Sequence, residues 1–162
     1  MTYEFDGLPL HILLVHAVVV IVPLTALCTA ATMVWPMARR RLGLVTPSLG
    51  IACLVLVFVT MKAGEWLLLR VAQTPAILQH ANDGRTLLPW AWALMGAAVV
   101  AWFWHRLAVR AWLRARIGPR FARAVAVLVT VAVLLACFGI TADVAVIGEA
   151  GSRAVWGGLL GS

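Results

Sequence analysis

The chain has 162 residues, of which 64% are hydrophobic and only 12% are charged. Soluble domains carry about 25% charged residues, so this composition excludes an ordinary soluble domain and favours an integral membrane protein. The formal net charge is +7, but most of it lies in two arginine-rich connections between apolar segments, which indicates a topology signal and attraction to anionic membrane lipids rather than nucleic-acid binding.

Four apolar segments follow one another, each with the roughly 20 residues that a helix needs to cross a bilayer. Successive helices joined by short connections pack most simply as an up-down-up-down four-helix bundle. We therefore expect an all-α integral membrane protein with a single domain over residues 1–162. Its transmembrane helices should span about residues 8–37, 46–70, 86–113 and 120–147, with a short helix outside the membrane at about 75–81.

The arginine-rich connections, residues 38–41 and 105–123, set the expected orientation. The positive-inside rule places both of them in the cytoplasm. With four spans, both termini and the second connection then lie on the non-cytoplasmic side. The sequence therefore predicts a multi-pass protein whose two ends differ in exposure to the cytoplasm.

Most ionisable groups other than arginine lie in the half of the chain expected to face outward. Such groups are expensive inside a membrane, and they usually face the bundle interior and pair with one another or bind something. Lys62 and Asp143 are expected at a similar depth, and we interpret them as an intramembrane ion pair. The outward cluster as a whole contains His11, His16, Lys62, Glu65, His80, Asp143 and Glu149.

Two of these histidines, His11 and His16, are five residues apart. A regular helix then separates them by about 140° and about 7.5 Å. Helical histidines that share a metal are four apart, so these two meet one site only if the first turn is irregular or His11 lies before the helix proper. His16 is the deeper, and burial favours its neutral, metal-binding form. The alternative for His16 is a hydrogen bond to a carboxylate such as Glu65.

The outward cluster predicts a cofactor or metal site made of His16, Glu65, His80, Glu149 and His11, with His11 as a further or supporting ligand. Histidines with a carboxylate suit a zinc, copper or iron ion. Haem b needs one imidazole from each of two facing elements. His16 and His80 supply these only if the second connection folds back over the bundle.

No catalytic motif is present: G-x-S-x-G, the P-loop, G-x-G-x-x-G and H-E-x-x-H are all missing, and no catalytic residue is assigned. Two functions remain beside metal or haem binding. One is a structural or accessory subunit of a larger membrane complex, or a homo-oligomer, in which the polar cluster is an internal hydrogen-bond network. The other is transport of protons or metal ions, with Lys62, Glu65 and Asp143 as a relay.

Four stretches of the sequence are similar to one bacterial family. They are "GLPLHILLVHAVVVIVPL", "AGEWLLLRV", "LQHANDGRTLLPWA" and "IGEAGSRAVWGG", and together they resemble the predicted-membrane-protein family known as domain of unknown function 2231, whose members begin with HP-x-x-VH. The resemblance implies a small four-helix protein of the bacterial cytoplasmic membrane, of unestablished activity and distantly like cytochrome b bundles. Ile12 stands where the family has proline, and Glu149 stands where many members have a tail histidine. If that tail position is a ligand, the carboxylate of Glu149 suits a metal-ion or proton-linked site better than bis-imidazole haem.

Overall fold

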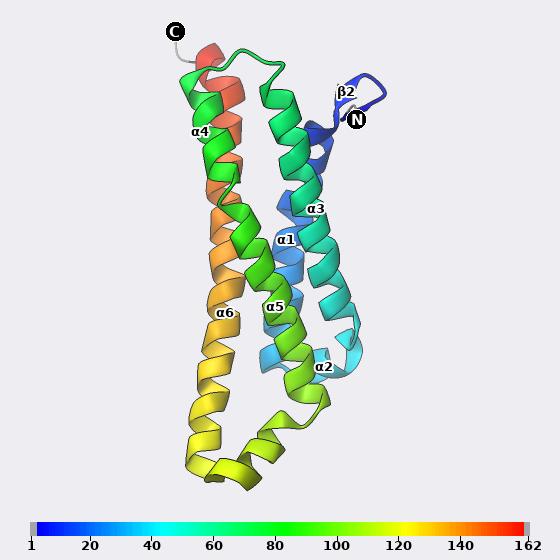
Figure 1. Cartoon of the computed structure of the whole chain (residues 1–162), viewed down its shortest axis with the longest axis vertical. Helices are drawn as coiled ribbons and strands as arrows, with labels where there is room; N and C mark the ends of the chain where they lie inside the picture. The colour runs from blue at the N-terminus through cyan, green and yellow to red at the C-terminus, as the bar shows by residue number, and fades with distance from the viewer. Residues whose placement is uncertain (1–2, 161–162) are drawn as a thin grey trace.

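The computed structural model describes residues 3–160, and helices make up most of that length (Figure 1). The predicted all-α fold is confirmed, and four helices are long and apolar enough to cross a membrane, as expected of a multi-pass membrane protein. The long helices are α1 (Leu10–Val34), α3 (Val45–Leu68), α5 (Leu87–Arg106) and α6 (Val109–Leu160); the short elements are β1 (Glu4–Phe5), β2 (Leu8–Pro9), α2 (Pro36–Leu42) and α4 (Pro75–Gly84).

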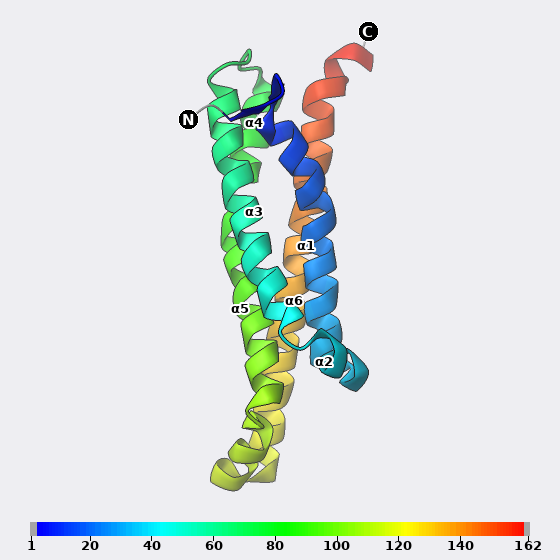
Figure 2. The same ribbon diagram turned by 90° about the vertical axis from the view of Figure 1, so that its right-hand side faces the viewer.

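The four long helices form a closed bundle in which each packs against its neighbours in the chain and α1 packs against α6. Their directions alternate, so both chain termini lie at the same end (Figure 1 and Figure 2). We call this the terminal end; it also holds the β1–β2 hairpin and α4, which packs along α6. The opposite end, with α2 and the reversal at Gly118, is the arginine-rich end.

The buried face of α1 is a stripe spaced by three or four residues, which is the period of one side of a helix. It contains Val18, Val22, Thr25, Thr29 and Thr32. The Thr25 hydroxyl donates to the carbonyl of Ile21 at 2.7 Å, and the Thr29 hydroxyl donates to that of Thr25 at 2.8 Å. These buried hydroxyls are therefore satisfied within their own helix, as an apolar interior requires.

Arg39 of α2 caps the C-terminal end of α1. Its guanidinium donates to the carbonyls of Thr32 at 3.0 Å and Met33 at 2.8 Å, which lie in the last turn of α1 and have no partner within that helix. Burial lowers the pKa of Arg39, and the nearby positive charge of Arg110 lowers it further. The side chain thus holds α2 against α1 by bonds to backbone rather than to an acid.

The third span is shorter than the sequence predicts. We expected it to continue to about residue 113, but α5 ends at Arg106, and Ala108 has a positive φ of 48° that no helix accommodates. The helix resumes at Val109 and the chain reverses at Gly118, where φ is 81°, before Pro119. Glycine permits this reversal because it has no Cβ.

The fourth span is longer than predicted. We expected helix to end near residue 147, followed by a polar tail, whereas α6 continues to Leu160. An ion pair between Glu149 and Arg153, four residues apart, and packing of α4 support the extra turns. The second connection is also more helical than expected, because α4 continues to Gly84, past its predicted end at about residue 81.

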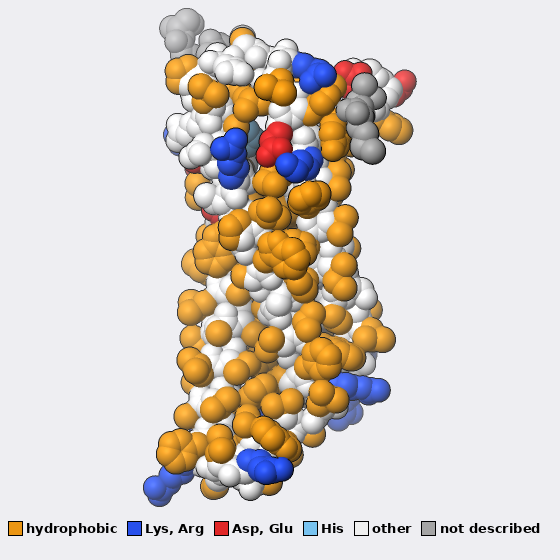
Figure 3. Space-filling view, in the orientation of Figure 1, with side chains coloured by type: hydrophobic (Ala, Val, Ile, Leu, Met, Phe, Trp, Pro, Cys, Tyr) orange, Lys and Arg blue, Asp and Glu red, His pale blue; other side chains and the backbone are white. Residues whose placement is uncertain are grey.

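The surface of the bundle matches a lipid environment. On the face drawn in Figure 3, hydrophobic side chains cover the middle of the molecule, Lys and Arg lie towards both ends, and acidic side chains appear only towards the terminal end. Large apolar side chains such as Leu27, Leu128 and Phe138 are 66%, 69% and 73% exposed. In water this exposure would be costly, but against acyl chains it costs little.

Candidate functional site

Two imidazoles from distant parts of the chain meet at the terminal end. His11 lies in the first turn of α1, and His80 lies in α4. Their ring centroids are 6.3 Å apart, with an angle of 65° between the ring planes. Both residues are half-buried. This histidine pair brings together two of the predicted ligands from two different elements.

His11 is held by α3. Its Nδ1 lies 2.9 Å from the carbonyl oxygen of Thr60. Because a carbonyl only accepts, Nδ1 carries the hydrogen and donates, which leaves Nε2 as the ring nitrogen with a free lone pair. Gly64, one turn further along α3, makes room for the ring, since a Cβ there would lie only 2.9 Å from His11 Cε1 and Nδ1.

His80 occupies a similar position against α6. A Cβ at Gly151 would lie 2.9 Å from His80 Cε1, so the imidazole packs directly against the helix backbone. His80 Nδ1 is buried and has no hydrogen-bond partner within residues 3–160. The second connection does fold back over the bundle, because α4 packs on α6. The helix starts after Thr74, whose side chain caps it by accepting a hydrogen bond from the Ile77 amide at 3.3 Å.

His16 does not join this pair. It is exposed, and its Nδ1 lies 2.7 Å from the carbonyl of Ile12 in its own helix. We expected His16 to be the more deeply buried of the two and His11 the more doubtful ligand, whereas in the structure His11 is half-buried and His16 is exposed. The reason is the rotation of α1: counting back seven residues, or two turns, from buried Val18 leads to His11, whereas His16 lies on the lipid side.

The carboxylates are engaged elsewhere. Glu65 pairs with Lys62 on α3 at 2.8 Å, and Glu149 pairs with Arg153 on α6. The Asp143 carboxylate oxygens lie 3.0 and 3.2 Å from Thr86 Oγ1, whose single hydroxyl hydrogen also has the Asp83 carbonyl as an acceptor at 2.7 Å. The predicted Lys62–Asp143 ion pair is therefore not formed, because Lys62 has a nearer acid one turn along its own helix.

Of the five expected ligands, His11 and His80 thus lie together. The other three, His16, Glu65 and Glu149, bond to groups on their own helices. Within residues 3–160 no three His, Cys, Asp or Glu side chains lie close enough together to hold a metal ion. His11 and His80 remain as a two-imidazole donor set. Imidazole nitrogen suits zinc, copper and iron, whereas magnesium and calcium need several oxygen ligands, which the pair does not offer.

The spacing of the two rings lies near the upper limit for two imidazoles that share one metal. With metal–nitrogen bonds of about 2.0 Å, two imidazoles on one metal have ring centroids about 6.4 Å apart in a linear arrangement and about 5.2 Å apart in the tetrahedral arrangement of zinc, so tetrahedral binding requires the rings to approach by about 1 Å. The observed separation is 6.3 Å. The buried, unpaired Nδ1 of His80 and the free Nε2 of His11 are nitrogens of the kind such a metal binds. The donor set therefore fits a transition metal.

Three residues of this site were missed in the sequence: Thr60, Gly64 and Gly151. Glycine is frequent in membrane helices, so neither glycine stands out from the sequence. The threonines of α1 were the usable signal, because Thr25, Thr29 and Thr32 mark the buried face on which His11 lies.

Comparisons with family models, curated proteins and solved structures find no match to this chain.

Proposed function

We propose that this membrane protein binds one transition metal ion, of the zinc or copper class, between His11 and His80 at the terminal end of the bundle. The single observation that carries the proposal is the histidine pair, in which α1 and α4 bring two imidazoles to a centroid separation of 6.3 Å. One imidazole has a free Nε2, and the other has a buried Nδ1 without a partner.

The surrounding residues support this role by positioning the rings. The Thr60 carbonyl fixes the tautomer of His11 and orients its Nε2, which is how hydrogen bonds to the outer nitrogen of a histidine prepare it as a ligand. Gly64 and Gly151 let both rings lie directly on helix backbones. This tight packing favours a small ion over the porphyrin of haem b, which needs a cavity beside both rings.

We further infer that the terminal end faces away from the cytoplasm, in the cytoplasmic membrane of a bacterium. The support is the distribution of arginine, which fills residues 38–41 and 105–123 at the opposite end. The resemblance of the sequence to a bacterial membrane-protein family points the same way. Under this orientation the histidine pair takes metal from the non-cytoplasmic side.

The proposal is tested by metal binding to the purified full chain in detergent or nanodiscs. The wild type should bind about one zinc or copper ion per chain, measured by elemental analysis and by titration. His11→Ala and His80→Ala should each weaken binding by more than about 100-fold, beyond the effect of losing a supporting hydrogen bond.

His16→Ala is the matched control, because it removes the same side chain from the same helix at an exposed position. It should leave metal affinity unchanged. Equal losses in the His16 and His11 variants would contradict the proposal, as would a wild-type chain that binds neither metal. In the latter case the pair is a packing contact, as expected of an accessory subunit. A Soret band in the absorption spectrum would show that the bound group is haem rather than a metal ion.

A further inference from the structure

The arginine-rich end carries positive charge without any acid to balance it. The sequence has no Asp or Glu in residues 7–64 or 84–142, the stretches that build this end. Arg110 lies close enough to Arg39 for their charges to interact unfavourably. Within residues 3–160, the ion pairs that form are both at the terminal end. Any anion that neutralises the arginines at this end therefore comes from outside the chain.

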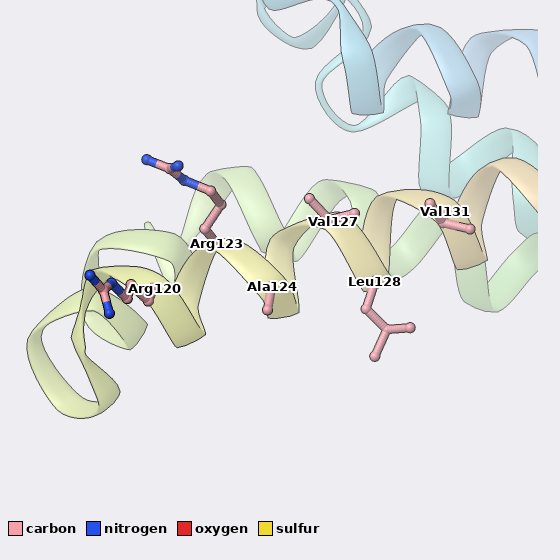
Figure 4. Close-up of a pocket in the computed structure, with 6 residues that line it drawn as sticks. All are labelled: Arg120, Arg123, Ala124, Val127, Leu128 and Val131. Atoms are coloured by element: carbon pink, nitrogen blue, oxygen red, sulfur yellow. The ribbon is translucent and has the colours of Figure 1, made fainter.

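A shallow depression of about 520 Å³ lies on α6 beside these charges (Figure 4). A second depression, of about 230 Å³, adjoins it and shares Arg123, Val127 and Val131. The first is lined by Arg120, Arg123, Ala124, Val127, Leu128 and Val131. The second also reaches Arg110, Ala126 and Thr130.

The three shared residues form a ridge along α6. Arg123, Val127 and Val131 are four residues apart and so lie on one side of the helix, whereas Ala124 and Leu128 lie on another side, as Figure 4 shows. Each depression follows one flank of this ridge. Arg120 belongs to one flank and Arg110 to the other. The ridge is thus charged at its arginine-rich end and apolar along the rest of its length.

We propose that this ridge binds one anionic diacyl phospholipid. The phosphate lies at Arg123, between Arg120 and Arg110, and the two acyl chains follow the depressions on either side of Val127 and Val131. Guanidinium groups bind phosphate through paired hydrogen bonds, and no carboxylate of this end competes for them. The apolar flanks also fix the direction of the two acyl chains. Diffuse electrostatic attraction alone does not fix that direction.

The test uses the purified full chain in detergent, titrated with phosphatidylglycerol or phosphatidylcholine of equal chain length, with bound lipid counted by native mass spectrometry. The wild type should bind phosphatidylglycerol more tightly. Arg123→Gln should weaken that binding by at least about fivefold, the effect of about one basic residue at a membrane surface. Arg114→Gln, in the part of α6 that precedes the reversal at Gly118 and lining neither depression, is the control and should have little effect.

A second variant tests the acyl-chain part of the site. Val127 is 58% exposed, so Val127→Trp should fold normally, yet it fills the space beside the ridge and should weaken lipid binding without changing charge. Water-soluble glycerol phosphate should compete only weakly. Equal losses for Arg114→Gln and Arg123→Gln, no loss for Val127→Trp, or full displacement by glycerol phosphate would each overturn the proposal.

Discussion

The two ends of the bundle satisfy their polar groups in different ways. At the terminal end, acids and bases pair along single helices, as in Lys62–Glu65 and Glu149–Arg153. At the arginine-rich end no acid is available, and Arg39 bonds instead to two backbone carbonyls. Each end also buries one imidazole nitrogen without a hydrogen-bond partner within residues 3–160, His80 Nδ1 and His105 Nε2.

This difference indicates which kind of external ion or molecule suits each end of the bundle. Two acids of the terminal end are paired with bases of their own helices, and the histidine pair beside them offers nitrogen donors that suit a metal cation. The arginine-rich end keeps its net positive charge, which suits anionic lipid. The following substitutions break or sharpen this contrast, and each can be measured by reversible unfolding in detergent or bicelles.

Gly64→Leu should have the largest effect. The new side chain would start 2.9 Å from the His11 ring and must displace it from between α1 and α3. Overpacking of this kind costs about 2–3 kcal/mol of unfolding free energy. Gly96→Leu is the control, because a Cβ at Gly96 meets nothing within 4 Å. Similar costs at the two glycines would show that the close packing of His11 is not needed.

Arg39→Leu should destabilise the arginine-rich end by about 2 kcal/mol. The substitution removes the donors to Thr32 and Met33, and hydrogen bonds from charged groups contribute about 1.5–3 kcal/mol. Arg40→Leu removes an exposed neighbour of the same type and should change stability little. A larger cost for Arg40→Leu would mean that charge, rather than capping of α1, is what this end requires.

Gly118→Ala should cost about 1 kcal/mol, because alanine is strained at a φ of 81° although it meets no atom within 4 Å. The effect is therefore purely conformational. Gly84→Ala, also in open space but with an ordinary φ, should be neutral or slightly stabilising. If Gly118→Ala is neutral too, the reversal between the two parts of α6 adopts another backbone conformation.

Lys62→Ala should have the smallest effect, below about 0.5 kcal/mol. Its ion pair with Glu65 joins residues three apart on one helix, and both side chains are 43% exposed, so solvent screens the interaction. A loss above about 1 kcal/mol would indicate that Lys62 pairs with a buried acid, as the sequence alone suggested for Asp143.

The sequence predicted the four spans well because hydrophobicity over about 20 residues is a strong local signal. It failed at the ends of α5 and α6, where Ala108 takes a positive φ and the helix continues past Ile147 because α4 packs against it. Both features depend on tertiary contacts. The choice between His11 and His16 could have been made from the sequence, because the threonines of α1 mark its buried face and His11 lies on that face.

The length of α6 places the histidine pair relative to the membrane. After the reversal at Gly118 the helix runs to Leu160, a rise of about 60 Å, twice the thickness of a bilayer's hydrocarbon core. If residues 124–142 fill that core, Gly151 stands about 13 Å above it, beyond most of the headgroup layer. His80, which packs against Gly151, therefore lies outside the hydrocarbon core, where a soluble carrier can deliver or remove a metal without entering the lipid.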